Sequence, residues 1–390
     1  MNFKQYTNVT KIIIPNDVVL KNGDFDARFQ GMTNLSQVSL PNDKVSSIHN
    51  TFRSCSNLTT AWCGDSVSNM ANAYLLCNNI TNAVCGPNVT DMSQTYCLCS
   101  GIETAVCGPN VTKFNDTYYN CFNLTEAVCG DNVIQMKNTY QGCRNLKTAV
   151  CGKNVENMYM AYSNCPNLTT AVCGENVRYL NRAYENCWNL TAPVCGNNVR
   201  SLSGTFYGCN KITYAVCGPD VYDMCRAYLA CSNLTTPVCG ENVTNFFSSY
   251  FNCVNLTSAV CGNNVTNMAG AYYNCKKLTK AVCGESVVNM YDAYQNCPNI
   301  SGNVYLYSPN ITNVGGCFGN RSNQSMLNIY AISGSTTMTT LQSTSRYSSL
   351  VGAAVTWVND SSNNRYYNTT YNIYIYPVNN VASARDANAD

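Results

Sequence analysis

The sequence is short of charge and almost without histidine. Asp, Glu, Lys and Arg make up 11% of the 390 residues and the net charge is +2, whereas charged residues are roughly 25% of an average soluble chain. A charge this small gives no support for binding nucleic acid through its phosphates. With His49 as the single imidazole, mechanisms that need a histidine base and metal sites built from several histidines are excluded. The composition argues against an enzyme, and no cofactor is expected.

Long apolar runs are also missing. No segment approaches the roughly 20 apolar residues of a spanning helix, so no membrane span is expected. The first eight residues, from Met1 to Asn8, contain neither the basic nor the apolar region of a secretory signal. The expected locations are therefore a virion, or a cell surface reached without a Sec signal, with the cytoplasm as the remaining alternative.

What the sequence does contain is a repeat of 22 residues. The pair Cys-Gly recurs at this spacing from Cys63 to Cys283, and a second series of cysteines keeps the same register from Cys55 to Cys297. Each copy also has a Leu or Ile, as at Leu58, and a Tyr or Phe, as at Tyr184. A unit of this length cannot bury an apolar face alone, so a core forms only where neighbouring units stack. The sequence predicts a solenoid.

Within one repeat, the segment Leu168-Thr-Thr-Ala-Val-Cys173 fits a strand. Alternation along a strand would turn Leu, Ala and Cys toward the core, and would turn Thr, the variable residue and Val toward solvent. The following Gly supplies a turn. The Asn-Val after it returns to the core, with Met70 and its equivalents at the next inward place.

The run Ala183-Tyr184-x-x-Cys187-x-Asn189-Leu190-Thr191, followed by the strand and by Asn198-Val-x-x-Leu202, resembles the BspA-type leucine-rich repeat. Val243-Thr-Asn-Phe246 and Val265-Thr-Asn-Met268 are similar to the related Asn-Val-Thr-Asn-Met-Ser surface-protein repeats of bacteria. The resemblance covers about residues 6–332. It implies a β-rich leucine-rich-repeat solenoid of about 15 rungs with a parallel β-sheet on one face.

Three segments are expected along the chain. Residues 1–50 are predicted to be N-terminal cap repeats, 51–332 the leucine-rich-repeat solenoid, and 333–390 a small C-terminal β cap or attachment element with a frayed tail. In this last segment, 353–358 and 364–378 are predicted to be strands, joined by a turn at 360–364. Whether the element only caps the solenoid or attaches it to a larger assembly stays open.

The 26 cysteines are predicted to be free, buried thiols that behave as small hydrophobes. Equivalent cysteines on neighbouring rungs would lie about 4.8 Å apart with parallel Cβ directions, which is longer than the roughly 3.8 Å between the Cβ atoms of a relaxed disulfide. The sequence contains no Cys-x-x-Cys pair, so no metal site is expected.

Two columns on the outer face of the predicted strands are the candidate binding residues; no catalytic residue is proposed. The valine column is the residue before each Cys of the Cys-Gly series: Trp62, Val84, Val106, Val128, Val150, Val172, Val194, Val216, Val238, Val260 and Val282. The variable column lies two residues earlier in each repeat, and Tyr214 and Lys280 stand out in it. A long exposed apolar stripe would be an interface; the alternative is that Val stands there because β-branched residues favour strands.

The expected function is binding without catalysis, through a rigid repeat face. The resemblance implies an adhesin, or a host-contact protein of a phage tail or particle surface, with a protein or glycan on a cell surface as the partner. One alternative is a structural protein that binds copies of itself through the valine column and forms an oligomer or filament. A second alternative is an intracellular leucine-rich-repeat scaffold.

Overall fold

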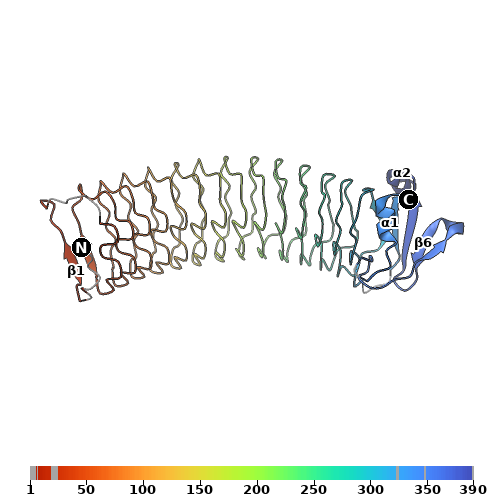
Figure 1. Ribbon diagram of the computed structural model, residues 1–390, viewed down its shortest axis with the longest axis horizontal. Helices are drawn as coiled ribbons and strands as arrows, with labels where there is room; N and C mark the ends of the chain where they lie inside the picture. The colour runs from red at the N-terminus through yellow and green to blue at the C-terminus, as the bar shows by residue number, and fades with distance from the viewer. Residues whose placement is uncertain (1–5, 7, 19–24, 322–324, 347, 389–390) are drawn as a thin grey trace. The chain divides into compact units, whose positions relative to one another are not determined.

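The computed structural model describes residues 6, 8–18, 25–321, 325–346 and 348–388, and the chain forms two compact units, Met1–Gly196 and Asn197–Asp390. Within each unit the repeats are irregular coils that stack one on the next, and the labelled helices lie in the C-terminal part of the second unit (Figure 1). At the start of the first unit, β1 (Lys11–Ile13) pairs in parallel with β2 (Gln37–Ser39), with Ile12 opposite Val38. These strands lie in the two irregular repeats expected there.

The core consists of columns of equivalent residues. In one repeat of the first unit, Leu146, Val155, Met158, Tyr162 and Cys165 are all fully buried, and the equivalent residues of the second unit are buried in the same way. The Leu, Met and aromatic places predicted to face inward are therefore confirmed. Because a unit of this length cannot bury an apolar face alone, the core forms between stacked repeats and not within any one repeat.

The buried aromatic residues form a stack of rings, which we call the aromatic column. In the first unit the centroids of Tyr140 and Tyr162 are 5.4 Å apart with the planes inclined by 7°. In the second unit Tyr272 and Tyr294 are 5.3 Å apart at 4°. These distances fall in the range that aromatic pairs prefer, so each ring contact stabilises the stacking of two rungs.

The parallel β-sheet predicted over the Leu-Thr-x-Ala-Val-Cys segment is wrong for the regular repeats. In the first unit this segment makes only single bridges between variable-column residues, such as Asn82 with Thr104 and Glu126 with Thr148. The longer series of parallel bridges lies instead in the Val-x-x-Met segment of each repeat. That series runs from Ser47 to Tyr179 in the first unit and from Ser201 to Asn313 in the second.

The tyrosine hydroxyls of the aromatic column explain why the predicted strand is interrupted. The hydroxyl of Tyr96 accepts a hydrogen bond from the Val84 N–H at 2.8 Å and donates one to the Val84 carbonyl at 2.8 Å. Tyr250 binds Val238 in the same way in the second unit. Because the hydroxyl takes the valine N–H, that N–H is not left to pair with the next rung.

Because of this contact, removing the hydroxyl oxygen of one tyrosine should lower the stability of the chain. In Tyr162→Phe the ring stays in the stack, but the Val150 N–H and carbonyl lose their 3.0 and 2.5 Å hydrogen bonds to the hydroxyl. An unsatisfied buried backbone group costs about 1–3 kcal/mol, so the urea midpoint should fall clearly. Tyr179→Phe, at an exposed tyrosine of the first unit, is the control and should leave the midpoint unchanged. Equal midpoints for both variants would show that the hydroxyl contact contributes nothing.

The second unit ends in a mixed sheet in the order β3-β4-β7-β6-β5. Strands β3 (Gly302–Leu306), β4 (Leu327–Ile332) and β7 (Ile373–Val378) are parallel, whereas β7, β6 (Arg365–Asn368) and β5 (Val358–Asp360) are antiparallel. The predicted turn is the short 3₁₀ helix η1 (Ser361–Asn363), in which Asp360 accepts a bond from the Asn363 N–H. The strand expected from residue 353 begins only at Val358, and the one expected over 364–378 is broken into β6 and β7.

Two helices in the C-terminal segment correct the prediction of a β element with a frayed tail. Helix α1 (Thr336–Leu341) begins after Ser335, whose hydroxyl accepts the Met338 N–H at 3.1 Å. Helix α2 (Val381–Ala387) begins after Asn380, whose side chain accepts the Ser383 N–H at 3.0 Å. Ser335 and Asn380 are therefore N-caps of these helices. Within the described residues, neither helix nor any other has the length and apolar character to cross a bilayer.

Candidate binding surface

The variable column is exposed, as predicted. Ten of its eleven members are exposed and Ala192 alone is half-buried. Tyr214 is 42% exposed, and the Lys280 side chain also lies in solvent. The fully buried Leu that begins each repeat lies only two residues before the variable residue, so the residue type in this column can change without disturbing the core.

The valine column is half-buried in every repeat, including Trp62 at its start. Its members lie two residues beyond the variable column in each repeat. At Val150, Val172 and Val260 the hydroxyl of a buried tyrosine accepts a hydrogen bond from the valine N–H, which holds the valine backbone against the core. The exposed apolar area of the valine column is therefore smaller than the sequence predicted, because the prediction assumed that the valines are fully exposed.

Two of the predicted site residues come together in the second unit. Lys280 and Val282 line a groove of about 760 Å³ with Tyr305, Tyr307 and Arg385. Arg385, from α2, donates a hydrogen bond to the Tyr307 hydroxyl at 3.3 Å. Sequence reasoning missed Arg385 because its segment was taken to be frayed.

Sequence reasoning also missed a row of tyrosines on the C-terminal sheet. Tyr305, Tyr330 and Tyr376 occupy matching places on β3, β4 and β7, and consecutive rings are 5.0 Å apart. Their positions within three strand-like segments could have indicated a single aromatic row.

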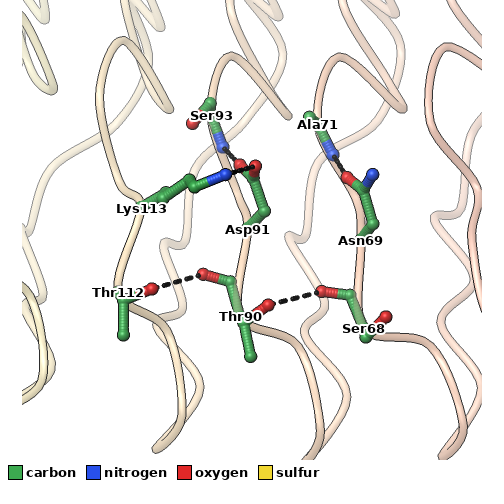
Figure 2. A network of polar contacts seen from close by, with 8 residues as sticks. All are labelled: Ser68, Asn69, Ala71, Thr90, Asp91, Ser93, Thr112 and Lys113. Atoms are coloured by element: carbon green, nitrogen blue, oxygen red, sulfur yellow. Dashed lines mark hydrogen bonds and ion pairs between the residues drawn. The ribbon is translucent and has the colours of Figure 1, made fainter.

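A third face of the first unit carries polar residues at the bridged segment (Figure 2). The Thr112 hydroxyl donates to the Thr90 carbonyl at 3.3 Å, and the Thr90 hydroxyl donates to the Ser68 carbonyl at 3.2 Å. Asp91 accepts the Ser93 N–H and forms an ion pair with Lys113 at 3.1 Å. These side chains bind the backbone or each other across neighbouring repeats, so this face stabilises the stacking of the rungs.

The Cys-Gly pairs mark the places where two rungs approach most closely. The Gly86 N–H donates to Cys63 Sγ at 3.1 Å. A Cβ atom added at Gly86 would lie 2.7 Å from the Gly64 carbonyl oxygen and 3.0 Å from Cys63 Sγ. Glycine is needed here because no other residue leaves room for the preceding rung.

The cysteines form no disulfide, and burial raises the pKa of many of their thiols. All 26 cysteines are free thiols, as predicted. The prediction that they are all buried is wrong for the Cys-Gly series, in which ten of the eleven thiols are only half-buried. Burial raises the pKa of Cys63 to about 11 and the pKa of Cys99 and Cys187 to about 12. Since the thiolate is the nucleophile and the metal ligand, such groups are inert at neutral pH. Among the described residues, no three His, Cys, Asp or Glu side chains gather where they could hold a metal ion.

The repeats identify the family. Residues 2–125, 115–225 and 181–301 match the BspA type leucine rich repeat region, in 6 copies. Because these matches span most of the chain, the chain belongs to the family of BspA-type leucine-rich-repeat proteins. The resemblance seen in the sequence, and the leucine-rich-repeat fold that it implied, are thereby confirmed.

Solved bacterial leucine-rich repeat structures are similar to the chain. A leucine-rich repeat protein from Bacteroides ovatus ATCC 8483 is 15% identical, with a TM-score of 0.57 over 90% of this chain and 92% of that chain. A leucine rich cell surface protein from Faecalibacterium prausnitzii A2-165 is 18% identical, with a TM-score of 0.47 over 76% of this chain and 87% of that chain. No curated protein matches the chain. The first of these likenesses supports the fold.

Proposed function

We propose that the chain is a binding protein without catalytic activity, and that it presents its variable column to a protein or glycan on a cell surface. The observation that carries the proposal is the contrast between an exposed, changeable column and the fixed backbone beneath it. Stacked rings and tyrosine hydroxyls hold that backbone on the core side. A surface that is already ordered loses little conformational entropy on binding, so this arrangement favours recognition.

The chemistry of the side chains supports binding over catalysis. The abundant nucleophile of the sequence is cysteine, and its thiols are protonated at neutral pH because burial raises their pKa. The tyrosine hydroxyls of the aromatic column are fully buried and are bound to valine backbone. Neither group is available to attack a substrate.

As its place of action we propose the surface of a phage particle, such as the tail, or a cell surface, with residues 333–390 as the attachment to a larger assembly. The support is the family, which is associated with contact at cell and particle surfaces. Mass spectrometry of purified particles, envelope and cytosol from the source culture tests this. Enrichment in particles or envelope is expected, and peptides confined to the cytosol would support the intracellular scaffold instead.

Self-assembly through the valine column is disfavoured by its half burial. We expect sedimentation of the purified chain to give a monomer at high concentration. Concentration-dependent assembly that is lost in both Val150→Lys and Val172→Lys would instead make the chain a structural protein.

A further inference from the structure

A groove of about 530 Å³ in the first unit is lined by residues of four successive repeats. It lies near the end of each repeat, where the chain turns back toward the next Leu. No member of the valine or variable column lines it. The groove is therefore separate from the surface to which the proposed function refers.

The groove exists because one column of side chains is interrupted. Asn120, Gly142, Asn164 and Asn186 occupy the same place in their repeats, all with left-handed backbone (φ of 56°, 76°, 59° and 57°). Asn186 donates a hydrogen bond to Asn164 Oδ1 at 3.0 Å, so the side chains of these two repeats fill the column. Gly142 has no side chain, and Asn120 leans over it so closely that an added Cβ would collide with Asn120 Oδ1.

The walls of the groove are aromatic and cationic. Trp188 is 55% exposed, the most exposed large aromatic side chain among the described residues. The guanidinium of Arg144 lies over the ring of Phe122, 4.9 Å from its centroid, which fixes where its donors point. No carboxylate lines the groove.

Several polar groups on these walls have unused hydrogen-bonding capacity. Among the residues that the structure describes, no side-chain hydrogen bond engages Tyr119, Asn120, Gln141 or the indole N–H of Trp188. Each amide can both donate and accept, the hydroxyl can do either, and the indole donates. A ligand that fills the groove would need hydroxyl groups of mixed donor and acceptor character to satisfy this set.

From these features we infer that the groove binds an oligosaccharide. A sugar presents hydroxyls that match side-chain amides, and an apolar C–H face that packs on an open indole ring. The rings of the aromatic column behind the groove are spaced at 5.6 Å from Tyr118 to Tyr140 and 5.4 Å from Tyr140 to Tyr162. A sugar unit of an extended chain has a similar length, so successive units meet successive rungs.

Two variants test the site without touching the core. Trp188→Ala removes the exposed ring. Gly142→Asn adds the side chain that the column has at Asn120, Asn164 and Asn186, in a backbone conformation that Asn tolerates, and it must push the Asn120 amide out of the space above Gly142. Tyr179→Ala is the control, because Tyr179 is an exposed aromatic residue of the same repeat as Trp188, at 37% exposure, and lies outside the groove.

The labelled full-length chain is first applied to a printed panel of cell-surface oligosaccharides, and the best-bound oligosaccharide is then titrated by calorimetry. We expect the native chain and Tyr179→Ala to bind alike, and both groove variants to lose about tenfold or more in affinity. The melting temperature of Trp188→Ala should stay unchanged, whereas Gly142→Asn must displace the Asn120 amide and should melt at a lower temperature. A native chain that binds no oligosaccharide on the panel, or only peptides in a parallel screen, would overturn the inference. So would groove variants that bind as the native chain does. Groove variants that bind as the native chain does leave the proposed function standing, since no variable-column residue is altered. A native chain that binds no oligosaccharide leaves the proposed function with a protein as its partner.

Discussion

Raising the pH from about 8 to about 11 should unfold the repeats, because the buried thiols cannot ionise in the folded chain. A thiol in an unfolded chain titrates near pH 8.5, whereas burial raises the pKa of Cys99 and Cys187 to about 12. Above pH 8.5 the unfolded state binds fewer protons than the folded state, so the free energy of unfolding falls as the pH rises. The contribution of the protonated thiols to the free energy of unfolding is complete below pH 8.5 and is lost by about pH 12.

The effect should be large because the same shift recurs along both cysteine series. One buried thiol removes about 1.4 kcal/mol for each pH unit, and domains are stable by only about 5–15 kcal/mol. Urea unfolding followed by circular dichroism at a series of pH values measures the slope. A flat profile from pH 8 to about 11 would contradict the burial of these thiols as protonated groups.

Replacing Gly86 by Ala should be among the most damaging single changes in the first unit. The new Cβ would lie 2.7 Å from the backbone oxygen of Gly64 and 3.0 Å from Cys63 Sγ. A backbone oxygen cannot rotate away, so the two rungs must separate. We expect a loss of about 3 kcal/mol, at the upper end of the usual cost of overpacking, measured as a lower urea midpoint.

Gly174→Ala provides the matched test of this explanation. There the closest atom is Cys151 Sγ at 2.9 Å, and the Gly152 carbonyl oxygen is at an ordinary 3.4 Å. Because the sulfur causes the clash, adding Cys151→Ala should restore much of the lost stability, with a coupling energy of about 0.5–3 kcal/mol. Adding Cys63→Ala to Gly86→Ala should restore much less, since the backbone oxygen remains. Equal rescue in both pairs would show that the sulfur and the carbonyl oxygen do not limit the rung spacing as the geometry implies.

Much of the core could be predicted from the sequence because a period of 22 residues assigns every copy of a residue the same surroundings. Leu146, Met158 and Tyr162 recur at fixed intervals, and all three are buried as expected. The half burial of the valines could not be predicted in this way. In most repeats the valine backbone is bound by the tyrosine hydroxyl twelve residues later, as at Val150, and periodicity alone does not reveal that contact.

The helices of the C-terminal segment and the groove could not be predicted from the sequence for a different reason. Ser335 and Asn380 are equally common in turns and at helix starts, so their role as N-caps follows only from the contacts they make. The groove depends on a single exception, Gly142, in a column that is otherwise Asn in the neighbouring repeats. The repeat alignment contains that exception, but its consequence appears only when Arg144 and Trp188 are seen to line the same space.

The most direct test of the proposed function is to replace the four largest non-Thr side chains of the variable column and to measure binding to intact cells. Ala192 and Ser258 are kept, and we call this variant the uniform chain. Thr is the commonest residue of this column, so the variant replaces Asn82, Glu126, Tyr214 and Lys280 by Thr. All four side chains are exposed, and surface changes of this kind usually alter stability by no more than about 0.5 kcal/mol. We predict that the native chain binds cells and that the uniform chain, with unchanged circular dichroism and melting temperature, does not. Equal binding by the two chains would contradict the account.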